Sequence, residues 1–345
     1  MKNRNFTEHG TRQSLTSKEN VKRVFNRLEP EWIPTRSDFF FFSPRVLPDN
    51  CARVLINEAQ TVRVDEKKDG ADMFGIEWTY VPEVMGAITK PGNPLLSDIS
   101  EWRTKLVWPD VTNWPWEESG AINKKLLEEN SEKLISVTIL NGLFERLITF
   151  LDFENACMAL VDEEVKEDVH ALFDRLCALY EEMILQLKKH FDFDMIEFHD
   201  DWGAQRSPFF SLSVCREMLV PYLKRLASFC RDHNILFQLH SCGCVGPLAD
   251  AIVEAGVDMW IPQYNANHLS EIQSAYGDKF ITAARRMLQP EMSPDEAIHA
   301  IDLFYELYAA DLPQKPVLFF DDFPTAEAKV YFYQKYTPLG QAGTF

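Results

Sequence analysis

An alternation of two patterns, which begins near residue 130, constrains the fold of this chain more than any other feature. Short apolar runs are separated by longer segments in which apolar residues recur at helical spacing. Short apolar strands joined by helical crossovers are typical of a parallel sheet that is covered by helices on both faces. The predicted strands cover residues 134–140, 195–199, 235–240, 257–261, 280–283 and 317–320.

The connecting segments have the pattern of amphipathic helices. The longest, from about 164 to 190, places eight apolar residues at spacings of three and four, which predicts one buried stripe. Further helices are predicted near 18–28, 215–229, 245–255 and 294–309, the third of them ending at Gly256. The segment from 82 to 118 is rich in proline and tryptophan, so we expect few helices there and interpret it as an irregular covering segment.

Two earlier strands, near 33–38 and 74–79, would bring the number of strands to eight. The sequence therefore predicts a (β/α)8 TIM barrel with an N-terminal extension, in a single domain over 1–345. Within it, 1–130 holds the extension, the first strands and the Pro/Trp-rich insertion, 131–325 holds the regular repeats, and 326–345 is a C-terminal tail. A doubly wound open sheet is the alternative, but the chain has neither a GxGxxG turn nor a P-loop.

The charge balance excludes several classes of partner. Lys and Arg total 35 against 53 Asp and Glu, a net charge of −18, whereas nucleic acids and anionic membranes attract clustered positive charge. No apolar run is long enough to span a bilayer, and the polar first 20 residues do not have the pattern of a secretory signal. The seven cysteines, an odd number, are spread through the chain, and we expect a reducing cytoplasm.

Polar residues follow most of the predicted strands. In a barrel, the carboxyl ends of the strands carry the active site, so these side chains are expected to converge on one pocket. The residues expected to bind a substrate there are Asp38, Glu145, Asp200, Gln205, Gln263, Tyr264 and Asp321. The alternative is that they are solvated loop residues.

A group of possible metal ligands follows the strand at 235–240. His240 and Cys242 are two residues apart and can point to one side of an extended segment, and Cys244 follows. Imidazole nitrogen and thiolate sulfur are preferred ligands of zinc, and a catalytic zinc needs only three protein ligands. The alternative is a buried strand end with small residues chosen for packing.

A second group follows the strand at 195–199. Glu197 and His199 share one face of this strand, and Asp201 joins them if the strand continues. Carboxylates beside a histidine can exchange protons or hold a metal. The alternative is a carboxylate-rich loop that orients the neighbouring strand.

Several motifs together resemble the uroporphyrinogen decarboxylase superfamily, and within it the corrinoid-dependent methyltransferases, including methylcobalamin:coenzyme M methyltransferases and relatives associated with O-demethylation. The resemblance extends from about Val21 to Pro324. The motifs are EFHDDWGAQ from Glu197, Ser207-Pro208, Pro221-Tyr222, LHSCG from Leu239, NGLFER from Asn141 and FEN from Phe153. The resemblance implies a (β/α)8 barrel, a zinc ion held partly by His240 and Cys242, and a pocket open to a corrinoid (cobalamin) carrier protein.

The chain departs from that family in one respect, because it has no cysteine after Cys244, whereas the zinc methyltransferases supply a late one. Glu197 is our first choice for the third ligand. Cys244 or an aspartate of the 321–322 pair is the alternative, and the zinc site could also have been lost.

The resemblance thus implies an enzyme that moves a methyl group between a corrinoid carrier protein and a small molecule. His199, Asp201 and Asp322 would orient the substrate or move a proton. A decarboxylase acting on a tetrapyrrole is one alternative, although the Arg-rich signature of that branch is absent. A non-catalytic barrel that binds the corrinoid protein is the other.

Overall fold

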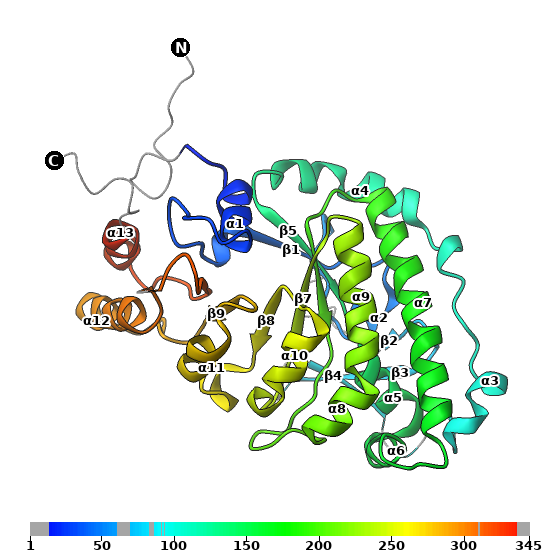
Figure 1. Ribbon diagram of the computed structural model, residues 1–345. Helices are drawn as coiled ribbons and strands as arrows, with labels where there is room; N and C mark the ends of the chain where they lie inside the picture. Colours follow the sequence, from blue (N-terminus) through cyan, green and yellow to red (C-terminus); the bar gives the residue numbers. More distant parts are fainter. Residues whose placement is uncertain are drawn as a thin grey trace.

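A parallel sheet forms the centre of the protein (Figure 1). The computed structural model describes residues 14–60, 70–82, 86–90, 92, 94–309 and 311–336. The five strands of this sheet are, in spatial order, β1 (Phe39–Phe42), β5 (Leu134–Ile139), β6 (Met195–His199), β7 (Leu236–Ser241) and β8 (Met259–Pro262). A second parallel pair consists of β9 (Thr282–Ala284) and β10 (Val317–Phe319).

Single bridges connect the pair to both edges of the larger sheet. Met259 in β8 pairs with Ile281 just before β9, and Phe319 in β10 pairs with Thr35 just before β1, both in parallel orientation. The backbone N–H of Phe319 donates to the Pro34 carbonyl at 3.0 Å. In the part of the chain that the structure describes, these single bridges place the pair beside both ends of the five-stranded sheet, and the two remain separate sheets.

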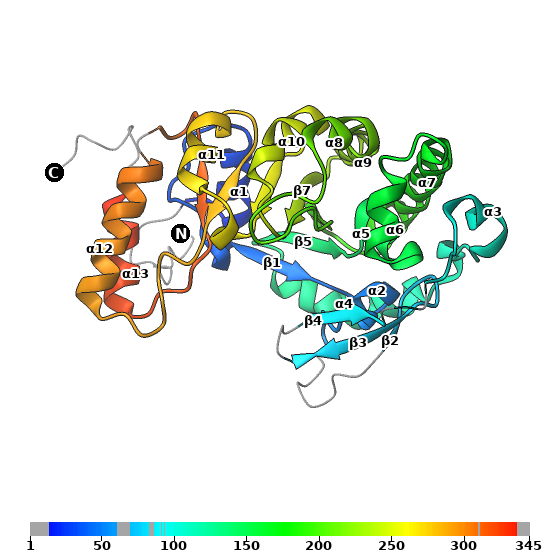
Figure 2. The same ribbon diagram turned by 90° about the horizontal axis from the view of Figure 1, so that it is seen from below.

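The two early strands differ from the sequence prediction. The first is formed by the four phenylalanines of β1 rather than by 33–38, so Asp38 precedes the strand and does not end it. The segment near 74–79 contributes to β3 (Glu77–Val81), which pairs antiparallel with β2 (Gly70–Ala71) and β4 (Gly86–Thr89). This small sheet lies to one side of the parallel strands (Figure 2), and the eighth parallel strand is not found among the described residues. The exposed Glu77 and half-buried Thr79 suit a sheet with one wet face.

Helices pack against the parallel strands. The helical segments predicted after residue 130 are found, but the one at 215–229 is divided into two helices, and the helices over 143–151, 153–159 and 269–276 were not predicted. The predicted stripe of the longest helix is buried in α7. The Pro/Trp-rich segment is more regular than predicted, because it contains β4 and because α4 begins at Trp116, directly after Pro115. The helices are α1 (Ser17–Phe25), α2 (Pro48–Ala52), α3 (Trp102–Lys105), α4 (Trp116–Glu129), α5 (Leu143–Leu151), α6 (Phe153–Ala159), α7 (Lys166–His190), α8 (Leu212–Met218), α9 (Val220–Asp232), α10 (Ala249–Ala255), α11 (Leu269–Tyr276), α12 (Pro294–Phe304) and α13 (Ala326–Lys335). In the described ranges, none of them is long and apolar enough to cross a bilayer.

The strands pack on two sides. The side chains on one face of the strands pack against the helices. Ile196, Phe198 and Phe237 belong to this face and lie in the largest apolar cluster. The opposite set forms a second apolar cluster that includes Met195 and Met259, together with Val21 and Val24 of α1. On this inner side Thr138, Glu197 and Gln238 are register partners, so the apolar interior becomes polar along β5 to β7.

A buried arginine connects α5 to the small antiparallel sheet and to α2. The guanidinium of Arg146 is fully buried and pairs with Asp49 of α2 and with Asp72, next to β2, the latter at 2.7 Å. Asn141 donates to the same Asp49 carboxylate, and the Tyr180 hydroxyl donates to the Asn141 carbonyl at 2.5 Å. This network fixes the N-terminal half of the chain against the first helix after β5.

At the opposite, amino end of the strands, Asp194 holds α1 in place. Its carboxylate accepts from the backbone N–H of Ile135 at 3.1 Å and pairs with Lys18 and Lys22 at 2.9 and 2.7 Å. Burial acts to raise the pKa of Asp194, but these hydrogen bonds outweigh it and hold the pKa below its usual value of 3.8.

We predict that Asp194→Asn lowers the free energy of unfolding at pH 7 by about 2 kcal/mol, because the charged hydrogen bonds to both lysines are lost. A depressed pKa means that the carboxylate stabilises the fold above pH 4, and that this contribution disappears as the pH falls below the unfolded value. Urea unfolding of both proteins at pH 7 and pH 3 measures the difference, which should shrink at pH 3. The exposed Asp192→Asn is the control, and an equal loss at both pH values would contradict the charge argument.

Candidate metal and active site

Three possible metal ligands meet at the carboxyl ends of β6 and β7. His199, Asp201 and His240 each offer one ligand atom, and these atoms lie within 4.8 Å of one another. The two histidines are register partners on adjacent parallel strands, with ring centroids 4.7 Å apart. Side chains at paired positions of a parallel sheet point to the same face, which explains why residues 41 positions apart come together.

Cys242 lies beside this group. Its Sγ is 3.3 Å from Nε2 of His240, and its backbone N–H donates to Oδ1 of Asp201 at 2.6 Å. The structure thus places the predicted pair His240 and Cys242 in contact. Glu197, the predicted third ligand, lies two residues before His199 on the same face of β6, and its carboxylate accepts a hydrogen bond from Gln238 at 2.7 Å. It is not part of the three-residue group.

The two loops that carry Asp201 and Cys242 cross at a pair of glycines. Gly243 has φ +85°, and a Cβ at this position would lie 2.0 Å from the Gly203 carbonyl oxygen. The loop after β7 is held further by Gln263, whose Oε1 accepts from the Gly243 N–H at 2.7 Å and whose Nε2 donates to Gln205 at 3.1 Å. Gln263 and Gln205, expected to bind a substrate, therefore support the loop that positions Cys242.

Glu145 and Arg53 lie behind His199. One carboxylate oxygen of Glu145 is 2.8 Å from Nδ1 of His199, and the other accepts from Arg53 at 2.9 Å. Arg53 also donates to the side-chain oxygen of Asn141 at 2.7 Å. Sequence reasoning missed Arg53, which directly follows α2 and which no spacing connects with the strand ends.

The charges of the group can be assigned from their surroundings. Burial opposes charge on Glu145 and His199, but their mutual attraction outweighs it, and the pKa of Glu145 falls to about 2 while that of His199 rises to about 9. Burial, reinforced by the positive His199, lowers the pKa of His240 to about 3. Burial also raises the pKa of Cys242 to about 12, and the charge of Asp201 adds to this shift. Without a metal, a neutral His240 and a thiol at Cys242 therefore face an imidazolium at neutral pH.

Three of the predicted site aspartates are occupied by hydrogen bonds to the protein itself. Asp200 is buried and accepts from the N–H groups of Phe144 and Glu145, at 3.1 and 2.8 Å, at the start of α5. Asp321 accepts from three successive backbone N–H groups, those of 286–288. Asp38 accepts from the Thr35 N–H at 2.7 Å at the amino end of β1. These carboxylates fix loops and helix ends.

The remaining predicted residues also lie outside the three-residue group. Tyr264 is half-buried in the short helical turn after β8, and Asp322 is exposed after β10. The N–H of Cys244 donates to the Ala204 carbonyl at 2.8 Å, and its side chain lines a separate cavity of about 370 Å³ with His268 and Ile272.

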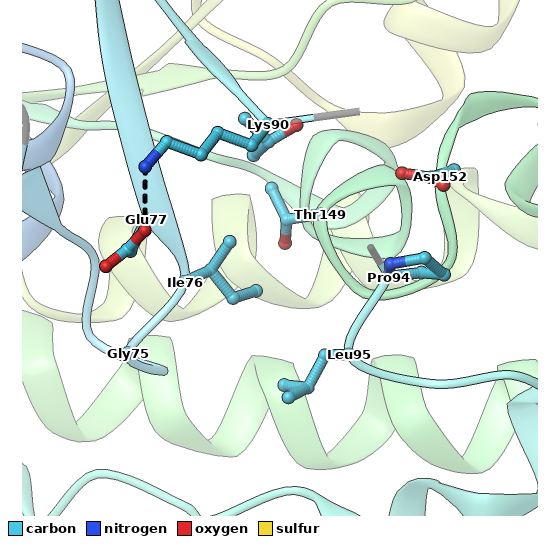
Figure 3. Close-up of a pocket in the computed structure, with 9 residues that line it drawn as sticks. Gly75, Ile76, Glu77, Lys90, Pro94, Leu95, Thr149 and Asp152 are labelled. Carbon is cyan, nitrogen blue, oxygen red and sulfur yellow. Dashed lines mark hydrogen bonds and ion pairs between the residues drawn. The ribbon is translucent and has the colours of Figure 1, made fainter. Parts of the chain in front are cut away.

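Another cavity of about 370 Å³ lies between the small antiparallel sheet and the junction of α5 and α6 (Figure 3). Glu77 and Lys90 form an ion pair of 2.8 Å on one side of it, and Thr149 and Asp152 lie on the other. His199, Asp201 and His240 do not line it.

Comparisons with known proteins support the fold. No family model matches the sequence, and no curated protein matches it. Among solved structures, a methyltransferase from Methanosarcina mazei is similar over 92% of this chain and 97% of that protein, with a TM-score of 0.61 and 12% identity. The chitinase ChiB of Flavobacterium johnsoniae aligns over 89% of this chain and 94% of the chitinase chain, with 11% identity and a TM-score of only 0.37. At such low identity the first likeness shows a shared α/β fold, and the second carries no argument.

We predict that Gly243→Ala destabilises the protein by about 3 kcal/mol, since it combines an unfavourable φ with a clash against the Gly203 backbone. Gly75→Ala is a matched control, because Gly75 has φ +77° and nothing within 4 Å of an added Cβ. That variant should lose only about 1 kcal/mol. Urea unfolding of both variants is the measurement, and equal losses would show that the crossing of the loops does not matter.

Proposed function

We propose that this protein is a methyltransferase that moves a methyl group between a corrinoid held by a carrier protein and a small-molecule donor or acceptor. The observation that supports it most is the group His199, Asp201 and His240 at the carboxyl ends of parallel strands, the side on which α/β barrels carry their active sites. We infer that the seven strands form such a barrel, closed by the bridges at Ile281 and Thr35. The likeness to the Methanosarcina mazei methyltransferase is consistent with this proposal. We also propose that the protein is located in the cytoplasm, as its seven dispersed cysteines indicate.

The donor set suits the zinc ion that the sequence resemblance implies. Two imidazoles and a carboxylate are zinc ligands, and three protein ligands leave one position open. His240 is neutral without a metal, because its pKa is about 3, whereas His199, whose pKa is about 9, would release its Nε2 proton when the metal binds. We assign the metal to His199, Asp201 and His240, and the adjacent Cys242 is the alternative to one of these three ligands, so that one position stays open. In this assignment His199 and Asp201 replace Glu197.

The chain's own residues would divide the work of the reaction. A bound zinc would supply Lewis acidity, which lowers the pKa of a thiol or hydroxyl group at the open position. Asp201, whose Oδ1 accepts from the Cys242 backbone N–H, would accept or return the proton of the incoming group through its other carboxylate oxygen. The loops after β6 and β7, fixed where Gly203 and Gly243 cross, would hold these groups still while the carrier protein docks over them.

The first experiment is the metal content of the purified, dialysed protein, measured by elemental mass spectrometry. We expect about one zinc per chain in the wild type and little in His240→Ala, because one of three ligands is gone. The exposed His299→Ala on α12 is the matched control and should retain its metal. Zinc-loaded protein should then demethylate methylcobalamin in the presence of a thiol acceptor, and His240→Ala should not.

Other outcomes would favour the alternatives. A wild-type protein that never met a chelator and holds no metal would contradict the zinc-assisted mechanism. Turnover of uroporphyrinogen by that metal-free protein would favour the decarboxylase. Tight binding of a corrinoid protein without methyl exchange would favour a non-catalytic barrel.

A further inference from the structure

We infer that Glu145 and Arg53 are positioning residues of the metal site: Glu145 fixes His199 so that Nε2 faces the metal, and Arg53 fixes Glu145. This inference rests on the metal site of the proposed function. It assigns a role in that site to a residue from the N-terminal part of the chain, outside the parallel strands.

The orientation of His199 follows from its contacts. Nδ1 lies 2.8 Å from Oε2 of Glu145, whereas Nε2 faces Asp201, with 3.9 Å between Nε2 and Oδ1. When Nδ1 donates its hydrogen to the carboxylate, the lone pair of the ligand tautomer is on Nε2, on the side of Asp201 and His240. A carboxylate behind a histidine ligand also makes the ring a stronger donor to the metal.

Glu145 is itself held from two directions. Its backbone N–H donates to Oδ1 of Asp200 at 2.8 Å, which fixes the start of α5 against the end of β6. Its second carboxylate oxygen, Oε1, accepts from Arg53 at 2.9 Å. Both oxygens are therefore engaged, and the side chains of Glu145, Arg53 and His199 are only 11%, 16% and 13% exposed. This leaves Glu145 little capacity for a substrate, and we reassign it from substrate binding to positioning.

Arg53 is fixed as firmly as its partner. Its guanidinium donates to the side chain of Asn141 at 2.7 Å and lies over the ring of Trp78, 4.9 Å from the centroid. Trp78 belongs to β3, and Asn141 donates to Asp49 of α2. The successive contacts from Arg53 to Glu145 and from Glu145 to His199 thus connect the small antiparallel sheet and α2 with the metal group.

The two histidine ligands are consequently unequal. His199 has a carboxylate on the nitrogen that faces away from the group, whereas the side-chain hydrogen bond found for His240 among the described residues joins its Nε2 to Sγ of Cys242. We therefore expect changes at Glu145 to weaken the bond from His199 to the metal and to leave the bond from His240 intact.

The test measures metal affinity directly. Dissociation constants for Zn²⁺ and Co²⁺ are determined by competition with a chelator for the wild type, Glu145→Ala, Glu145→Gln and Arg53→Met. We expect Glu145→Ala to bind about 10- to 100-fold more weakly, which is the usual effect of removing a partner of a histidine ligand. Glu145→Gln should lose less, because its amide oxygen still accepts from Nδ1 and preserves the tautomer. Arg53→Met should fall between the wild type and Glu145→Ala.

The matched controls are Glu181→Gln and Arg225→Met, which remove an ion pair of 2.7 Å between α7 and α9, outside the metal group. They should leave both dissociation constants unchanged. The visible absorption of bound Co²⁺ gives an independent readout, since Glu145→Ala should change its band positions and the controls should not.

The outcomes separate this inference from the function on which it rests. Wild-type affinity in both Glu145 variants, together with loss of metal in His240→Ala, would overturn the positioning role and leave the metal site standing. A wild-type protein without affinity for either ion would overturn both. If Glu145→Ala fails to fold in chelator, Glu145→Gln decides: wild-type affinity and an unchanged Co²⁺ spectrum in this folded variant would contradict a role for the carboxylate charge, and partial loss would support it.

Discussion

The ion pairs of Arg146 determine where the candidate site can form. A guanidinium that is removed from water is stable only if charges of opposite sign surround it, and Asp49 and Asp72 supply them. These two carboxylates raise the pKa of Arg146 although its burial acts in the opposite direction. Replacing the arginine alone would leave two buried carboxylates without a counter-charge, so α5, α2 and the small antiparallel sheet can only pack together in the arrangement that keeps all three residues paired.

The neighbouring residue depends on this packing. Glu145 precedes Arg146 in α5, and Arg53 follows α2 directly, so the same contact that buries Arg146 brings these two side chains within hydrogen-bond distance of each other. The N-terminal part of the chain, which the sequence indicated only as an extension and a covering segment, is therefore structurally continuous with the group at the ends of β6 and β7.

Much of the regular fold could be predicted because periodicity reports burial. The bounds of β6 agree with the prediction. The long, uninterrupted apolar stripe of α7 also made this helix predictable, and it begins only two residues later than expected. His240 and Cys242 were also predicted as neighbours, because a spacing of two residues in an extended segment fixes their common face. The early strands could not be placed in the same way, since the aromatic run of β1 has no polar residues to mark its faces and β3 belongs to another sheet.

The roles of the acidic residues could not be read from the sequence. Asp200 and Asp321 follow strands as Asp201 does, but each accepts from two or more backbone N–H groups, whereas Asp201 accepts from one, that of Cys242, and among the described residues it is the carboxylate grouped with the two histidines. What separates these cases is the path of the neighbouring loops. Arg53 was missed for a related reason, since its partner Glu145 is 92 positions away and only the buried network connects them.

The pairing of His199 with His240 has a consequence for folding. Successive side chains of a strand point to opposite faces of the sheet. A shift of β7 against β6 by one position would therefore turn the Leu239 side chain to the face that now carries His240, and His240 toward the helices. A cation held by both rings would bind the native alignment of the two strands and no shifted one. By mass action, binding of the cation would then stabilise the native alignment relative to the shifted ones. The apparent affinity for the cation would measure the fraction of the protein in which the two strands are aligned correctly.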